Sequence, residues 1–216
     1  MDVTGTITGV GVLDKGVALL DAVERQPKTV SELSRELAMT LTTCHRLTTA
    51  LSTHRLLRRD TEGRFHLGHR FATSSLVEVG TPVLRRLRDG TRETAQLWVR
   101  RGGVRVVVLS VESDMELRAV LPVGSQVPLS AGGSAGAVLS GLGPGPGQTA
   151  GPGWVESVAQ RTPGLGSVSS AVRLHGDVIA AVCLVAPLAR LGPGPGAAYG
   201  DHVREAAGQI ETGLPH

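Results

Sequence analysis

The sequence predicts an α+β protein with a small winged helix-turn-helix domain followed by a larger domain that mixes strands and helices. Three observations indicate this: amphipathic or capped helical segments come first, a short strand-turn-strand follows them, and apolar strands separated by Gly-rich turns fill the rest. A chain of 216 residues is long enough to bury two cores. We therefore expect domains over residues 1–70 and 82–216, joined by a linker over 71–81.

Three helices are predicted in the first domain. Apolar residues recur three and four positions apart over residues 12–24, the spacing of an amphipathic helix. Thr29 and Glu32 fit a capping box that opens a second, short helix. Thr40 can cap a third helix running to about Leu57. This order and spacing are those of a helix-turn-helix.

The third predicted helix has one apolar and one polar face. Cys44 lies on the same face as Leu47 and Leu51 and is expected to point inward, with His54 back toward that side. The polar residues at its start and on the opposite face are Thr42, Thr43, His45, Arg46 and Thr49. Small hydroxyl residues at a helix N-terminus let the backbone approach phosphate, and His and Arg can donate to base edges. This face is typical of a DNA recognition helix.

A metal site is the first alternative for this histidine-rich segment. Zinc needs converging ligands with short paired spacings, but Cys44 and His45 diverge on the helix. His66 and His69 have a suitable gap, yet two ligands do not close a structural site. We expect no metal ion and no other cofactor.

A β-hairpin wing is predicted after the third helix, with its turn at Thr61 to Gly63 and with Arg58, Arg59 and Arg64 on it. Residues 40–70 contain six Arg against two acidic residues, a distribution that favours phosphate contacts. A solvated charged face, or a small domain for protein contacts, remains an alternative explanation.

The second domain begins with a short helix at "PVLRRLRD". "TAQLWVRR" and "VRVVVLSV" around a Gly pair indicate a hairpin, and "ELRAVLPVG" and "VPLSA" continue the extended structure. "GSAGAVLSGL" is helical, "SVSSAVRL" and "VIAAVCLVAP" form a second hairpin, and Tyr199, Val203, Ile210 and Leu214 mark a closing helix. The Gly/Pro segments 143–153 and 192–196 are expected to be loops. Mixed hairpins and helices indicate an antiparallel sheet with helices against it.

The sequence predicts the cellular compartment of the protein, because membrane and secretion signals are lacking from it. No apolar run approaches the roughly 18 residues of a membrane span, and no secretion signal opens the chain. Two cysteines 139 positions apart do not make a disulfide framework. We expect a cytoplasmic protein with two free thiols and no membrane partner.

"GGSAG", residues 132–136, matches the G-x-S-x-G pattern of hydrolase nucleophiles, with Ser134 in the nucleophile position. About 80 residues follow Ser134, too few for the rest of a hydrolase sheet, and no oxyanion-hole motif precedes it. We therefore expect no catalytic residues and no enzyme activity.

The sequence resembles IclR-family transcriptional regulators over nearly its whole length. The stretches that carry the resemblance are, in order, "GVGVLDKGVALLDAV", "SELSRELAMTLTTCHRLTTALSTHRLLRRDTEGRFHLG", "PVGSQVPLSAGGSAGAVL" and "SVSSAVRLHGDVIAAVCLVAP". The C-terminal part is similar to short regulators of leucine and other amino-acid biosynthesis genes. The resemblance implies a GAF-like effector-binding domain after the winged domain. Two departures are Ala38, where the family turn usually has Gly, and a connecting helix after the wing that is shortened relative to the family.

The resemblance also implies an effector pocket. Its lining matches Ala119, Val127, Gly133, Ser134, Ser157, Ser167, Cys183 and Val185. A ligand carboxylate would lie on the backbone N–H groups at Gly133 and Ser134, at the start of a helix. Cys183 and Val185 stand where serines are common, which makes the pocket less polar. A purely structural turn is the alternative for these residues.

Together these observations predict a DNA-binding transcriptional regulator, a metabolite-responsive repressor of amino-acid or small-acid metabolism genes. Its expected partners are double-stranded operator DNA, a small-molecule effector with a carboxylate, and further copies of itself in a homodimer or homotetramer. The alternative is a ligand-sensing or interaction module that no longer binds DNA.

Overall fold

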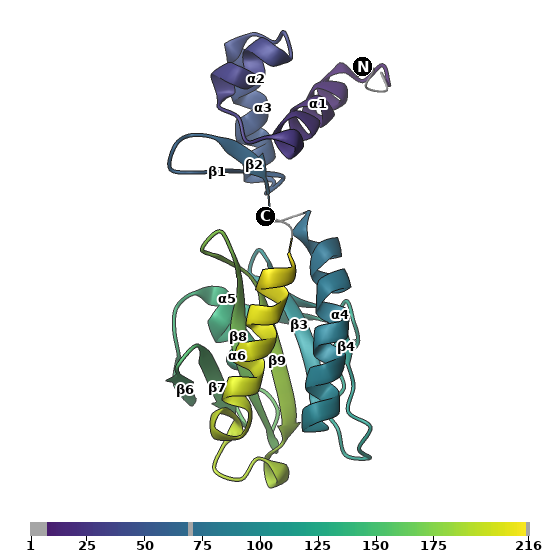
Figure 1. Ribbon diagram of the computed structural model, residues 1–216. Helices are drawn as coiled ribbons and strands as arrows, with labels where there is room; N and C mark the ends of the chain where they lie inside the picture. Colours follow the sequence, from purple (N-terminus) through teal and green to yellow (C-terminus); the bar gives the residue numbers. More distant parts are fainter. Residues whose placement is uncertain (1–7, 69–70, 215–216) are drawn as a thin grey trace. The chain divides into compact units, whose positions relative to one another are not determined.

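The computed structural model describes residues 8–68 and 71–214, which form two compact units divided between Thr73 and Ser74 (Figure 1). Among these residues no helix combines the length and the apolar character that a bilayer crossing requires. The first unit holds three helices and a hairpin, and the second holds a sheet with helices on both faces. The α+β class expected from the sequence is confirmed.

The first unit has the predicted winged helix-turn-helix order. Its elements are α1 (Gly11–Arg25), α2 (Val30–Glu36), α3 (Leu41–Thr53), β1 (Leu57–Arg59) and β2 (Phe65–Leu67). Glu32 N donates to Thr29 Oγ1, and Thr29 N donates to the Glu32 carboxylate at 2.7 Å, which confirms the capping box. Thr40 caps α3 as predicted. The helix ends at Thr53, earlier than expected, because Arg55 takes a positive φ of 57° and turns the chain into β1.

One apolar cluster holds the first unit together. The buried side chains are Leu19, Ala22, Val23, Leu33, Cys44, Leu57 and Phe65, drawn from all three helices and both strands. The free thiol Cys44 points inward, as predicted from its helical face. His54, expected near the apolar side, is exposed at the C-terminal end of α3, because the helix ends there and the following turn leads away.

Helix α1 buries only part of its predicted apolar face. Leu19 and Val23 lie in the core, but Val12, Leu13 and Val17 are exposed. The N-terminal half of this amphipathic helix therefore presents apolar side chains at the surface of the unit.

The turn between α2 and α3 is closed by a residue with a left-handed backbone. Ala38 has φ 50°, in the region that favours glycine. Ser34 Oγ donates to Met39 O at 2.7 Å across this turn, and Met39 N donates to Ser34 O. Ala38, which stands where the family that the sequence resembles usually has Gly, therefore adopts a backbone conformation that glycine takes at lower cost.

The second unit is a seven-stranded antiparallel sheet in the order β5-β4-β3-β9-β8-β7-β6. Its strands are β3 (Thr94–Arg101), β4 (Val104–Val111), β5 (Gln126–Pro128), β6 (Gln148–Gly151), β7 (Trp154–Val158), β8 (Leu165–Leu174) and β9 (Asp177–Pro187). The helices are α4 (Ala72–Thr91), α5 (Ser134–Ser140) and α6 (Pro195–Gly213), with 3-10 turns at Leu129–Ala131 and Leu188–Arg190. Both predicted hairpins, β3–β4 and β8–β9, are confirmed.

The connecting helix expected after the wing and the short helix expected at the start of the second domain form one continuous helix, α4. Pro82 lies inside this helix and cannot donate a backbone hydrogen bond. Thr81 Oγ1 donates to Val77 O at 2.6 Å just before the proline. The packing of Leu76, Val83, Leu84 and Leu87 in the core keeps the helix continuous through Pro82.

One loop prediction and one strand prediction are wrong. The Gly/Pro segment 143–153 contains strand β6, which pairs with β7 at the edge of the sheet, where few ladder bonds are needed. The stretch "ELRAVLPVG" contains no strand, and Leu117, Val120 and Val123 are exposed rather than paired. Apolar content alone suggested a strand there, although no neighbouring strand is available to it.

The helices of the second unit lie on both faces of the sheet. Figure 1 shows α4 and α6 in front of the sheet and α5 behind it. Side chains alternate along β3: Leu97 lies near Gly80 of α4, whereas Trp98 packs with Ala135 and Leu139 of α5. The α5 face of the sheet carries the cavity described below.

Candidate DNA-binding surface and effector cavity

The polar face predicted on α3 is exposed in the structure. Thr42, His45, Arg46 and Thr49 are all exposed along one side of the helix, opposite the buried Cys44. Thr43 has a different role, because its Oγ1 accepts from Thr40 Oγ1 at 2.8 Å and its N–H donates to the same oxygen. Thr43 therefore belongs to the cap that starts the helix, and the other four residues form the free face.

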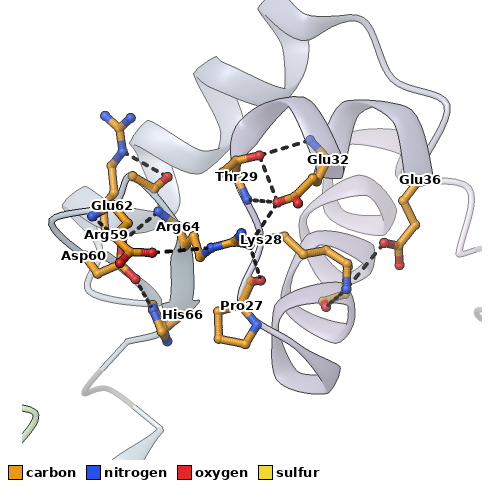
Figure 2. Close-up of polar contacts among 12 residues, drawn as sticks. Pro27, Lys28, Thr29, Glu32, Glu36, Arg59, Asp60, Glu62, Arg64 and His66 are labelled. Atoms are coloured by element: carbon orange, nitrogen blue, oxygen red, sulfur yellow. Dashed lines mark hydrogen bonds and ion pairs between the residues drawn. The ribbon is translucent and has the colours of Figure 1, made fainter.

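The wing is fastened to α2 by a polar network, shown in Figure 2. Asp60 Oδ1 accepts from Arg64 N at 2.8 Å and Glu62 N at 3.0 Å, which shapes the turn. Asp60 Oδ2 lies 2.7 Å from His66 Nε2. The hydrogen bond to His66 is the first cause that lowers the pKa of Asp60, followed among the favourable contacts by the backbone donors of the turn.

Arg64, predicted to contact DNA, is held inside this network instead. Its Nη1 lies 3.2 Å from Glu32 Oε2 and 3.3 Å from Pro27 O, so the guanidinium joins the wing to the N-terminus of α2 (Figure 2). The same Glu32 carboxylate accepts from Thr29, and these hydrogen bonds are the main cause that lowers the pKa of Glu32. This position of Arg64 favours a structural role over a phosphate contact.

The other two predicted wing arginines lie on β1. Arg59 is exposed, its Nε donates to Gly63 O at 3.3 Å, and its guanidinium lies 5.7 Å from the centre of the Phe65 ring. Arg58 is half-buried on the same strand. Arg59 is therefore the wing cation best placed to meet a polyanion.

The structure shows no metal-ligand cluster among the histidines of this segment that it describes. Within residues 8–68 and 71–214, no three His, Cys, Asp or Glu side chains are placed to hold a metal ion. His69, one of the predicted candidates for a ligand pair, falls outside the described residues.

A cavity of about 50 Å³ lies in the second unit between α5 and the sheet. Six of the predicted effector residues line it: Gly133, Ser134, Ser157, Ser167, Cys183 and Val185. Cys183 and Val185 lie on one face of β9, two positions apart as the alternation requires.

Two predicted effector residues lie outside the lining of this cavity. Val127, paired with Arg105 across β4 and β5, is buried in the apolar cluster around Trp98. Ala119 lies in the irregular segment after β4, where its carbonyl accepts from Thr94 Oγ1 at 2.9 Å. Packing and backbone pairing hold these two residues away from the lining of the cavity.

Ser134 lies in a cluster of hydroxyl and thiol groups. Its Oγ lies 2.8 Å from both Ser167 Oγ and Ser169 Oγ, and 3.9 Å from Cys183 Sγ. A serine nucleophile needs a basic partner such as histidine, and the partners that the structure shows for Ser134 are serines and a cysteine. Burial raises the pKa of Cys183, so this residue supplies a neutral thiol to the cluster.

Gln160 organises the opposite side of the cavity. Its Oε1 accepts from Gly133 N at 2.8 Å, Gln148 Nε2 at 3.0 Å and Ser157 Oγ at 3.1 Å, while its amide nitrogen donates to Pro146 O. The Gly133 N–H, which we expected to hold a ligand carboxylate, is therefore already bonded to a side chain of the protein.

Sequence reasoning missed the most polar groups of the cavity. Arg105 of β4, Gln96 and Trp98 of β3, and Gln160 and Arg161 between β7 and β8 all line it. One signal for Arg105 is visible in the sequence: it shares the inward face of β4 with Val107, where a charged residue is not expected. The residues of the β7–β8 connection are placed by long-range pairing and carry no such local signal.

The fold and these two sites define a class of protein: a winged helix-turn-helix unit whose third helix has an exposed polar face, followed by a separate unit with a cavity between a helix and a sheet. This is the organisation of a ligand-responsive DNA-binding regulator.

Comparison with known proteins gives the family. The IclR helix-turn-helix domain matches residues 12–61, and the C-terminal domain of the bacterial transcriptional regulator IclR matches residues 70–144, together more than half of the chain. The chain belongs to the IclR family of DNA-binding transcriptional regulators.

Several relatives share this assignment. The transcriptional repressor AllR of Klebsiella pneumoniae is 28% identical over 249 aligned positions, covering 95% of this chain and 90% of AllR. The regulator BhcR of Paracoccus denitrificans is 30% identical over 142 residues, which cover 61% of this chain and 51% of BhcR. AllR of Escherichia coli matches over a similar part, so the chain aligns with only about half of these last two relatives.

Solved structures share the fold. An IclR-family regulator from Rhodococcus superposes over 100% of this chain and 99% of its own, with a TM-score of 0.59 and 24% identity. An IclR homologue from Microbacterium hydrocarbonoxydans, solved with 4-hydroxybenzoate, covers 94% of this chain and 98% of its own, with a TM-score of 0.55 and 24% identity.

Proposed function

We propose that this protein is a metabolite-responsive repressor that holds operator DNA with α3 and the wing and releases it when a small acid fills the cavity of the second unit. The observation that carries this proposal is the exposed face of Thr42, His45, Arg46 and Thr49 on a helix whose opposite side is buried. Such a helix can enter the major groove without unfolding its own domain.

DNA binding is tested by a gel-shift assay on the DNA upstream of the protein's own gene. Arg46→Ala should weaken specific binding by about 1–3 kcal/mol, because an arginine that donates to guanine acceptors contributes this much discrimination. The matched control is Arg85→Ala, which removes the same charge from an exposed position on α4. If the Arg46 and Arg85 variants bind like the parent, α3 is not the recognition helix and a sensing module without DNA binding becomes the better description.

An effector response is supported by the cavity in the second unit and by the ligand of one relative, because 4-hydroxybenzoate in the Microbacterium homologue is a carboxylate. Genes of amino-acid or small-acid metabolism are the corresponding targets. Cys183→Trp should fill the cavity and abolish ligand-driven release, while the ligand-free protein keeps its operator affinity. If the ligand still releases the Cys183→Trp variant from DNA, the effector binds elsewhere.

A homodimer, or a homotetramer made of two such dimers, is the assembly that reads two half-sites. The exposed Val12, Leu13 and Val17 of α1 support it, since these apolar side chains become buried when a second copy covers them. Leu13→Glu should shift the protein toward monomer in light scattering, whereas Lys15→Glu, an exposed polar position on the same helix, should not. A parent protein that is already monomeric at micromolar concentration and binds its operator fully would contradict the assembly.

A further inference from the structure

Arg105 is a buried cation without an acidic partner. Only 2% of this residue is exposed, and its guanidinium lies 5.3 Å from the centre of the Trp98 ring. Nη2 donates to Gly132 O at 2.6 Å, but Nε and Nη1 have no hydrogen-bond partner. Among the described residues, none of the ion pairs includes Arg105. A charge withdrawn from water and left unpaired is costly, so this arginine requires a separate explanation.

The helix beside Arg105 is shaped to accept it. A Cβ on Gly136 would lie 2.0 Å from Arg105 Nη1, and a Cβ on Gly133 would lie 3.2 Å from Arg105 Nη2. Gly133 and Gly136 of the "GGSAG" stretch therefore leave space for the guanidinium at the cavity wall. The last glycine of the G-x-S-x-G pattern, Gly136, thus has a steric reason that has no connection with a nucleophile.

The charge balance of the cavity is one-sided. Arg105 and Arg161 both line it, and no Asp or Glu is among the residues that line it. Burial is the main cause that lowers the pKa of Arg105, and the positive charge of Arg161 lowers it further. The Arg105 guanidinium nevertheless keeps its positive charge at neutral pH, because arginine does not lose its proton in proteins.

We propose that the cavity binds a small dianion, with one negative group paired to Arg105 inside and the second paired to Arg161 at the mouth. Arg105 is then the residue that selects the ligand. This inference deepens the proposed effector response and rests on it only in calling the dianion an effector.

Other ligand chemistries fit the cavity less well. A neutral ligand would leave the Arg105 charge buried and unpaired, and a cation would add repulsion from two guanidinium groups. A monoanion satisfies Arg105 but leaves Arg161 to water. The Gly133 N–H cannot take over the anion, because it already donates to Gln160 Oε1. Two carboxylates or one phosphate would match both arginines.

Calorimetry on the full-length, DNA-free protein tests the proposal. The probes are acetate as a single negative charge, malonate and succinate as dicarboxylates, and inorganic phosphate as the phosphate source. At least one of the dianions should bind at least tenfold more tightly than acetate. Preference for succinate or malonate over phosphate assigns a dicarboxylate, and the reverse assigns a phosphate compound. Equal affinity for acetate and every dianion would overturn the proposal.

Two substitutions separate the arginines. Arg161→Gln changes an exposed residue, so the fold is preserved, and it should reduce the preference for the dianion over acetate to about twofold. Arg105→Gln should weaken binding of every anion at least tenfold, with a far-UV circular dichroism spectrum as the check on folding. Arg85→Gln is the matched control and should change neither affinity nor preference. A dianion preference that survives Arg161→Gln would refute the two-arginine site, even if the Arg105 variant fails to fold.

The outcome also separates this proposal from the proposed function. A dianion that binds with the predicted dependence on Arg161 but leaves the operator complex intact in a gel shift keeps the site and removes the effector response. Operator release by an uncharged metabolite, with no anion binding in calorimetry, keeps the response and removes the dianion site.

Discussion

Gly136→Ala should destabilise the second unit, although alanine is the better helix former. Gly136 lies in α5, and a Cβ there would meet Arg105 Nη1 at 2.0 Å and Leu129 O at 3.2 Å. Forcing an extra methyl into such a packed position costs about 1–3 kcal/mol. The gain in helix propensity from glycine to alanine is up to about 1 kcal/mol. The net loss should therefore be about 1 kcal/mol, together with loss of anion binding as the guanidinium is displaced.

Gly208→Ala is the matched control. Gly208 lies inside α6, and a Cβ there would meet no atom within 4 Å, so only the propensity gain of about 1 kcal/mol applies. Urea unfolding followed by tryptophan fluorescence reports this unit alone, because both tryptophans, Trp98 and Trp154, belong to it. If both substitutions stabilise the unit equally, Arg105 does not pack against α5 as described.

Three further outcomes concern the winged unit. Ala38→Gly should stabilise it by about 0.5–1 kcal/mol by relieving the positive φ, seen as slower amide exchange in α2 and α3; faster exchange would contradict this. Because its contact with His66 lowers the Asp60 pKa, the stabilisation that Asp60 gives is present at neutral pH and lost as the pH falls through its folded pKa. The urea midpoints of the winged unit in the parent and in Asp60→Asn should therefore converge as the pH falls below the ordinary aspartate pKa of about 3.9, and a constant gap would count against this. Arg59→Ala should flatten the salt dependence of DNA binding. Arg64→Ala should instead lower the urea midpoint of the winged unit and leave the salt dependence of DNA binding unchanged. If both variants flatten the salt dependence equally, Arg64 contacts DNA as well.

The helices and caps of the first unit could be predicted from the sequence because their signals are local. The capping box of Thr29 and Glu32, the cap at Thr40 and the inward face of Cys44 all depend on residues within four positions of one another. Such signals survive folding because the tertiary structure does not have to create them. The same applies to the two hairpins, whose turns lie between adjacent strands.

Contacts between residues far apart in the sequence could not be predicted from it. The tie between Arg64 and Glu32 joins residues 32 positions apart, and nothing in the wing sequence separates this arginine from one that contacts DNA. Gln160 acquires its role only when β7 and β8 bring it beside Gly133. The position of Arg105 in the cavity could have been suspected from the sequence, because it is a charged residue on the inward face of β4. The space that the guanidinium occupies could not, because it depends on the glycines of α5 that face it.

The pairing of β3 with β9 has a consequence for how the protein is made. Thr94 pairs with Val185 and Trp98 with Ala181, so the centre of the sheet joins segments more than 80 residues apart. The ribosome must release the chain beyond residue 185 before this ladder can close, whereas the contacts that hold the winged unit together all lie within residues 8–68. During synthesis the nascent chain therefore passes through a stage in which its first unit can be complete and its cavity does not yet exist.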